Sequence, residues 1–201
     1  MKVAVEQAPE VVTDPRVDAD GLDGLHEVAS RLAAGEPLHM ALTRVAHLVT
    51  ALLRADACFV YVLEGSDFVL RASMAVSSDS VDRLRLRVGP SVAGWLTAHR
   101  EAVSVPSGAS DDARCQAFSE QAAEPFEAFL SVPILSRGRL VGVINVQHVC
   151  PHDHTDQEIR LVSMAGFLVG TEIEMTRLEA ENAQLVQRLE ERKVIDRAKG
   201  I

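Results

Sequence analysis

The C-terminal part of the chain predicts one long helix, and this helix constrains the fold more than any other feature. Residues 155–158 read TDQE, a capping-box pattern in which Thr155 and Glu158 satisfy the first free N–H groups of a helix. Few helix-breaking residues follow it. Near the end, an apolar stripe at helical spacing consists of Val194, Ile195, Ala198 and Ile201. A stripe needs a partner surface, so we expect an output unit to follow Ile201.

A second apolar pattern in this helix predicts a coiled coil over residues 175–191. Its members alternate in steps of three and four residues: Met175, Leu178, Asn182, Leu185 and Leu189. With Met175 at heptad position a, Asn182 also falls at a, where a polar side chain sets the register of a parallel two-stranded coil. The seam weakens at Arg192, which falls at d. We predict a homodimer; the alternative is a single amphipathic helix packed on its own domain.

Upstream of this helix, the periodicity predicts an α+β sandwich, with an antiparallel sheet flanked by helices. Residues 1–20 have no sustained period and are expected to form a mobile tail. Two helices are predicted over 21–35 and from Pro37 to Leu52. Two hairpins are predicted over 57–75 and 129–149, each around a glycine-containing turn. Short strands over 84–88 and 102–105 lie between them, with short helices after Ser91 and over 115–121.

The composition disfavours nucleic acids and membranes as partners of this chain. The chain carries a net charge of -9 and only 4% aromatic residues, which disfavours a broad nucleic-acid or anionic-lipid surface. The N-terminus has no apolar signal segment, and no apolar run approaches a membrane span. Cys58, Cys115 and Cys150 are widely spaced and odd in number, which is typical of a reducing compartment. We expect a cytoplasmic protein without a membrane partner.

Several segments, in their order along the chain, resemble the GAF sensor family over roughly residues 22–175. They read GPSVAGW (89–95), AVSV (102–105), DDAR (111–114), SVPI (131–134) and VGVINV (141–146). The resemblance implies a GAF-like sensor domain over 21–174, a scaffold that serves many ligands. The Asn-Lys…Phe…Asp-Glu signature of cyclic-nucleotide members is missing from the sequence, and so is the cysteine set of the sulfoxide reductases. Cys115 lies near the pigment-attachment position of bilin-binding members, but Gln116 follows it where they have His.

The segment 192–201 resembles the opening of an ANTAR domain, a helical RNA-binding module of bacterial antiterminators. Its basic residues are Arg192, Lys193, Arg197 and Lys199. The resemblance implies a regulator in which a signal at the sensor domain passes through the dimer helix to an RNA-binding output beyond Ile201. RNA would then be bound only by a longer chain. The alternatives are a small-molecule or redox sensor that acts on a protein partner, and a dimerisation scaffold without a ligand.

A ligand pocket is predicted between the sheet and the polar segment 107–126, where aromatic walls and a few polar groups suit a small molecule. Its candidate lining residues are Tyr61, Trp95, Cys115, Phe118, Phe126, Phe129 and Ser131. The alternative is that these residues only fill the core. The ligand is not identified by the sequence, and no cofactor is indicated.

Other reactive residues have ordinary interpretations as well. Groups that bind metals occur at Cys150, His152 and His154. The alternative is a strand-to-helix turn before the Thr155 cap, which Pro151 and Asp153 suit. His148, at a strand end, is either a ligand-facing residue or a structural one. Cys115 is either a redox thiol beside Arg114 or a buried structural thiol. No nucleophile elbow or phosphate loop occurs, so we expect a binding module rather than an enzyme.

Overall fold

The computed structural model describes residues 15–74, 80–87, 96, 99–112, 115 and 125–199, with the backbone alone for 15–19 and 192–199. The described strands form one six-stranded sheet in the order β3-β2-β1-β6-β5-β4, and every neighbouring pair is antiparallel. The strands are β1 (Ala57–Glu64), β2 (Asp67–Ser73), β3 (Arg85–Arg87), β4 (Val103–Val105), β5 (Ala128–Ser136) and β6 (Arg139–His148). The helices are α1 (Pro15–Ala33), α2 (Leu38–Leu53) and α5 (Asp156–Lys199). The predicted α+β class, with flanking helices and a long C-terminal helix, is confirmed.

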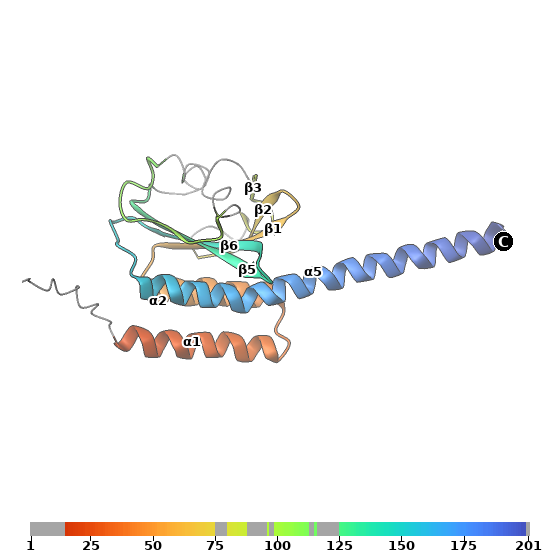
Figure 1. Ribbon diagram of the computed structural model, residues 1–201, viewed down its shortest axis with the longest axis horizontal. Helices are drawn as coiled ribbons and strands as arrows, with labels where there is room; N and C mark the ends of the chain where they lie inside the picture. The colour runs from red at the N-terminus through yellow and green to blue at the C-terminus, as the bar shows by residue number, and fades with distance from the viewer. Residues whose placement is uncertain are drawn as a thin grey trace, which may run out of the picture.

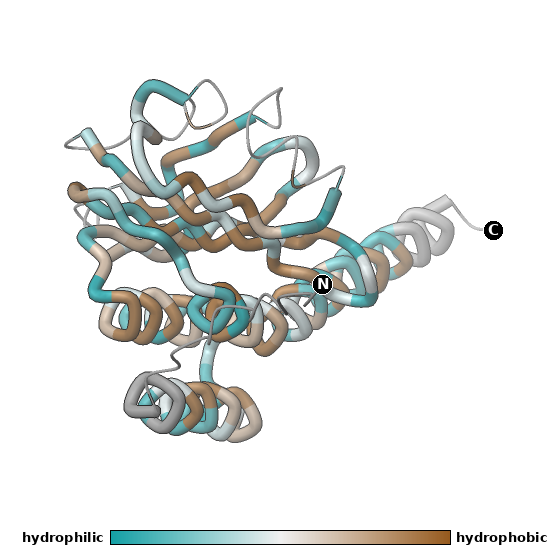
Figure 2. The backbone as a smooth tube through the Cα atoms, turned by 60° about the vertical axis from the view of Figure 1, so that its left-hand side comes forward, coloured by the Kyte–Doolittle hydropathy of each residue, from teal (hydrophilic) through white to brown (hydrophobic). Residues whose placement is uncertain are grey.

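The molecule has three stacked layers. From top to bottom in Figure 1 they are the sheet, α2 with the first half of α5, and α1. The apolar core between the sheet and the helices includes Val45 on α2, Ile144 on β6 and Val169 on α5, all fully buried. Each fully buried Val, Leu or Ile side chain contributes about 1.5–3 kcal/mol. The middle of the sheet is accordingly brown in the hydropathy colouring of Figure 2. This core holds the first half of α5 against the domain.

The two long hairpins form where the turn residues favour them. In the β5–β6 turn, Arg137 has φ +49° and Gly138 has φ +73°, as both central residues of a two-residue type I′ turn require. In the β1–β2 turn, Gly65 has φ +63° at the first central position. These turns set the registers Ser136↔Arg139 and Glu64↔Asp67. Both hairpins predicted from the sequence are therefore present.

The N-terminal helix differs from its predicted boundary. Helix α1 begins at Pro15 rather than at residue 21, so the predicted tail is wrong over residues 15–20; the rest of that tail, residues 1–14, lies outside the described part. A proline is tolerated in the first turn of a helix, because its missing N–H would have no partner there. Leu25 and Val28 of α1 are buried in the core, while Leu22 is exposed.

Helix α5 lies close to β5 and then leaves the domain. At Gly170, an added Cβ would come within 2.6 Å of the Leu135 carbonyl oxygen, so the absence of a side chain permits this approach. Among the described side chains of α5, the last buried ones are Ile173 and Glu174. Beyond them the helix projects away from the sheet (Figure 1). Among the described helices, α5 included, none combines the length and hydropathy needed to cross a membrane.

Candidate functional site

The face of the sheet opposite the helices carries the predicted pocket residues that the structure describes. Tyr61, Cys115, Phe126 and Phe129 belong to one buried apolar cluster, which also contains Leu96 and Val143. Phe126 and Phe129 stack with ring centroids 5.7 Å apart. Trp95 and Phe118 lie outside the described residues. The structure thus brings Tyr61, Cys115, Phe126 and Phe129 together in one buried cluster, which fits both the predicted pocket and the alternative that these residues fill the core.

Ser131, the polar member of the predicted pocket, is paired with a residue that sequence reasoning missed. The Ser131 hydroxyl donates a hydrogen bond to Asn145 Oδ1 at 2.5 Å, and both residues are fully buried. The two lie opposite each other in the β5–β6 ladder. Asn145 Nδ2 is buried and makes no hydrogen bond within the described part of the chain. Aligning the two strands about the turn alone would pair Ser131 with Ile144; the register shift between Ile134 and Leu135 puts Asn145 opposite Ser131 instead.

The three cysteines differ in environment. Cys58 is fully buried in the core below the sheet, and this burial raises the pKa of its thiol to about 12. Cys115 is also fully buried, and its backbone N–H donates to the Asp112 carbonyl at 2.8 Å. Cys150 is exposed. No disulfide joins these residues, and the only thiol of the three that solvent reaches is that of Cys150.

The predicted dimer seam lies on the projecting half of α5. Its apolar members are exposed: Met175 by 55%, Leu178 by 42%, Leu185 by 58% and Leu189 by 59%. Asn182 is exposed on the same helix. The alternative was an amphipathic helix packed on its own domain, but these described seam residues are exposed. All four predicted RNA-output residues lie in α5: Arg192, Lys193, Arg197 and Lys199. Their side chains are outside the described part of the chain.

A groove of about 1230 Å³ lies where α5 leaves the domain, lined by α2, the β1–β2 turn and α5. Charged residues connect α5 to the sheet at this place. Glu174 accepts hydrogen bonds from Arg177 at 2.8 and 2.9 Å, and Arg139 of the β5–β6 hairpin approaches it at 3.6 Å. The Arg177 hydrogen bonds lower the pKa of Glu174. This carboxylate therefore links the second hairpin to the start of the exposed seam.

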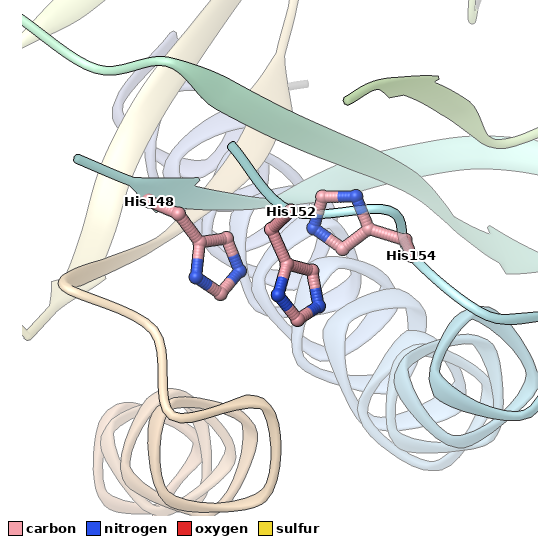
Figure 3. A group of neighbouring side chains, drawn as sticks. All are labelled: His148, His152 and His154. Carbon is pink, nitrogen blue, oxygen red and sulfur yellow. The ribbon is translucent and has the colours of Figure 1, made fainter. Parts of the chain in front are cut away.

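At the opposite end of β6, His148 comes together with His152 and His154, which were considered separately from it on the sequence alone. His148 ends β6, and His152 and His154 lie in the loop before α5 (Figure 3). The rings of His148 and His152 are parallel with centroids 4.2 Å apart, and the His154 ring lies 4.8 Å from His152 and 5.2 Å from His148. Each residue offers a ring nitrogen within 4.8 Å of the other two. We call these residues the histidine cluster.

Neighbouring side chains contact two of the three rings of the histidine cluster. Ser104 Oγ lies 3.0 Å from His154 Nδ1, and Glu158 Oε1 lies 3.1 Å from His152 Nε2. Glu158 also accepts hydrogen bonds from the backbone N–H of Thr155 at 2.7 Å and from its hydroxyl at 3.0 Å. The Thr155 hydroxyl in turn accepts from the Glu158 N–H at 3.2 Å, so the predicted capping box is confirmed. The cluster is thereby attached to the first turn of α5.

Burial controls the protonation of the histidine cluster. Desolvation, followed by the nearby His152 and His148 rings, lowers the pKa of His154 to about 4. Desolvation and the His152 ring also lower the pKa of His148. His148 and His154 are only 5% and 6% exposed, and their Nε2 atoms make no hydrogen bond within the described residues. At neutral pH these rings are therefore neutral, with a lone pair available to a ligand.

This arrangement corrects the donor set considered from the sequence. Cys150 is exposed and is not a member of the group that converges, whereas His148 is. The reason is geometric: the loop folds back so that the His152 N–H donates to the Pro106 carbonyl at 3.0 Å. That contact puts His152 and His154 beside the end of β6. The spacing H-x3-H-x-H at a strand end was the available signal.

Comparisons with known proteins agree with the fold. The model of the GAF domain family matches residues 37–173. Nif-specific regulatory protein of Azospirillum brasilense is 24% identical over 171 residues, which are 82% of this chain and 27% of that protein. The chain thus spans about a quarter of that relative.

Two solved structures show the same fold. The GAF domain of an Acinetobacter phosphoenolpyruvate-protein phosphotransferase superposes with a TM-score of 0.70 at 23% identity, covering 78% of this chain and 94% of that one. The corresponding domain from Coxiella burnetii gives a TM-score of 0.69 at 23% identity, with coverages of 81% and 98%.

Proposed function

The chain belongs to the GAF domain family, and from this premise we propose that it is the sensing module of a dimeric transcription regulator. A ligand at the face of the sheet opposite the helices changes the packing of α5, and the dimer of α5 helices passes the change to an output unit. In this proposal the domain acts by binding and transmission, and it catalyses no reaction.

One observation carries the proposal: α5 is a continuous helix that changes from core to exposed apolar seam within a few residues. The family match ends at residue 173, Ile173 is buried in the core, and Met175 is already 55% exposed. A surface helix with an exposed apolar stripe gains about 1.5–3 kcal/mol for each such side chain that a partner buries. A second copy of this chain fits the stripe, because Asn182 at an a position matches itself in a parallel coil.

The transcriptional role has two supports. The curated relative is named a Nif-specific regulatory protein, and the chain matches 27% of its length. Residues 192–201 resemble the start of an ANTAR domain, and α5 continues through Lys199 without a break. We therefore propose an RNA-binding antitermination output after Ile201. The dimer helix would present two such outputs in a fixed relation to each other.

A small molecule with a hydrogen-bond acceptor is the class of signal that the sheet face favours. Tyr61, Phe126 and Phe129 supply apolar contacts, and the Ser131–Asn145 pair supplies one polar position. Asn145 Nδ2 is a buried donor without a partner among the described residues, and an acceptor on the ligand would satisfy it. A non-denaturing mass spectrum of gently purified protein tests this, because a retained ligand adds its mass to the chain.

Sedimentation equilibrium of two matched variants tests the dimer. Leu185→Glu places a charge in the seam, whereas Gln184→Glu adds the same charge on the preceding residue, outside the a and d positions. We expect Leu185→Glu to weaken dimerisation at least about 100-fold, because both copies lose a buried leucine. Gln184→Glu should dimerise like the parent chain. Equal behaviour of the two variants would contradict the seam.

The RNA output needs a longer chain. We expect the 201-residue chain to show no specific RNA binding in a filter or mobility assay at physiological salt, because its net charge is -9. A natural chain that continues past Ile201 should bind a structured RNA. Tight binding by the 201-residue chain alone would refute the placement of the output, while leaving the dimer test unaffected.

A further inference from the structure

The histidine cluster has a feature that core packing alone does not explain. His148 and His154 are at least nine-tenths buried, yet the Nε2 atom of each has no hydrogen-bond partner among the described residues. A buried polar atom left unpaired costs about 1–3 kcal/mol. Figure 3 shows the His148 and His152 rings side by side, with the His154 ring beside them. Both unpaired nitrogens therefore belong to one group of converging donors.

We propose that His148, His152 and His154 together bind one divalent transition-metal ion of the zinc type. The three rings supply the donor set, and imidazole nitrogen is a preferred ligand of zinc, copper and nickel. The proposal concerns a different part of the fold from the sensing face and does not depend on the proposed function.

The hydrogen bonds around the rings leave one nitrogen of each available. His154 Nδ1 faces Ser104 Oγ at 3.0 Å, which leaves Nε2 for the ion. His152 Nε2 faces Glu158 Oε1 at 3.1 Å, which leaves Nδ1. His148 contributes its unpaired Nε2. Metal-bound histidines usually donate their other N–H to a carboxylate or another oxygen, and that outer contact orients the ring. Ser104 Oγ is this outer contact for His154, and Glu158 Oε1 is the outer contact for His152.

The spacing of the rings suits a shared ion after a small adjustment. One nitrogen from each ring lies within 4.8 Å of the others. Zinc–nitrogen bonds of about 2.0–2.1 Å in a tetrahedral site place the nitrogens about 3.3–3.4 Å apart, so the rings must approach by up to about 1.5 Å. Because a metal ion lies in the plane of the imidazole that binds it, and the His148 and His152 ring planes are only 7° from parallel, one of these two rings must also rotate. His152 has a side-chain exposure of 31%, so an ion can enter from solvent.

The fourth coordination position is expected to be open. Glu158 contacts the cluster through its carboxylate, which lies 3.1 Å from His152 Nε2. This carboxylate already accepts two hydrogen bonds from Thr155. It therefore serves as an outer partner rather than as a ligand. Three histidines with an open fourth position bind water or a small anion there. Cys150, being exposed and outside the converging group, is not a ligand.

The ion would connect three elements that meet at one end of α5. His148 belongs to β6, His152 and His154 to the loop, and Glu158 to the first turn of α5. Binding to the folded chain alone stabilises it in proportion to the logarithm of the free ion concentration. Occupancy should therefore raise the thermal midpoint of the domain that contains the start of α5.

Zinc binding by the untagged, chelator-treated chain tests the proposal. We expect titration with Zn²⁺ against a chromophoric chelator to give one ion per chain, and Zn²⁺ to raise the melting temperature. His152→Ala and His154→Ala should each weaken binding by more than about 100-fold, because loss of even an outer partner of a metal ligand costs 10–100-fold. Glu158→Gln, which removes an outer partner, should weaken it by about 10–100-fold.

Two variants control for unspecific binding. His47→Ala removes an exposed histidine of α2 that is not in the cluster, and Cys150→Ser removes the exposed thiol. Both should bind zinc like the parent chain. His152 is the least buried ligand, so His152→Ala is the variant most able to keep the fold, which circular dichroism checks. The proposal is overturned if the folded parent chain binds no stoichiometric zinc, or if folded His152→Ala binds as tightly as His47→Ala.

Discussion

At the scale of single residues, the unsatisfied polar groups of the described chain are concentrated on one strand and the loop after it. The three buried side-chain atoms without a partner in that part are Asn145 Nδ2, His148 Nε2 and His154 Nε2. The first lies in β6 on the face of the sheet opposite the helices, and the other two lie in the histidine cluster. Since buried polar atoms are usually paired, these positions are the ones on which the two proposed sites rest. Strand β6 thus carries polar groups of both proposed sites.

The histidine cluster should make the metal-free protein sensitive to acid. The pKa of His154 is lowered to about 4 in the folded state from an ordinary value of 6.5, chiefly by burial and then by the His152 and His148 rings, against the opposing charge of Glu158. Between these values the unfolded chain binds the proton and the folded chain does not, so the free energy of unfolding falls as pH falls. The slope from one such proton is at most about 1.4 kcal/mol per pH unit.

Urea unfolding at pH 7 and pH 5 in the presence of EDTA measures this slope. His154→Asn removes the titrating group and keeps a polar side chain near Ser104 Oγ. We expect the variant to lose less stability than the parent chain over this interval, with the lowered pKa of His148 accounting for part of the loss that remains. Equal losses in the two proteins would contradict the assignment.

The shared face of Tyr61, Phe129 and Ser131 could be predicted from the sequence more readily than the histidine cluster, and the reason is local. Tyr61, Phe129 and Ser131 lie in strands whose alternation is visible, so the face they share follows from period two. The cluster depends on a loop that returns to the end of β6 through the His152–Pro106 backbone contact. No periodic pattern encodes such a return, and His148 was therefore considered apart from His152 and His154.

At the scale of elements, the strength of the turn signals decided what could be predicted. The hairpins at Gly65 and Gly138 and the capping box at Thr155 were all identifiable, because each depends on a few neighbouring residues. The pairing of β1 with β6 joins distant parts of the chain, and no local signal specifies it. The start of α1 was also misplaced, because Pro15 reads as a loop residue unless the helix beyond it is already known.

The packing of α5 on β5 should depend on Gly170. Its Cβ position lies 2.6 Å from the Leu135 carbonyl oxygen, which is backbone and cannot rotate away. We expect Gly170→Ala to lower the free energy of unfolding by about 1–3 kcal/mol in a urea titration, as overpacking does. Such a loss would also loosen the base of the signalling helix.

Gly166, one turn earlier on the same helix, is the matched control. Its Cβ position lies 3.6 Å from the Pro133 carbonyl oxygen, which is an ordinary contact. Gly166→Ala should therefore be neutral, or stabilising by up to about 1 kcal/mol through helix propensity. If both variants lose the same stability, general intolerance of α5 to alanine, and not the approach at Gly170, is the cause.

At the scale of the whole molecule, α5 connects both ends of the domain to the exposed seam. Its first turn contacts the histidine cluster through Glu158, its middle packs on β5 at Gly170, and Glu174 joins it to the β5–β6 hairpin before the seam begins. Both ends of β6 are therefore linked to α5: one through Arg139 and Glu174, and the other through the histidine cluster and Glu158. This continuity is the physical basis of the proposed signal transfer.

The central claim is that the projecting half of α5 holds two copies of the chain together. Non-denaturing mass spectrometry of the gently purified protein tests it most directly. We expect a species of twice the 21.8 kDa chain mass, which Leu185→Glu converts to the single chain and Gln184→Glu does not. A parent protein that appears only at 21.8 kDa over the micromolar range would contradict the claim.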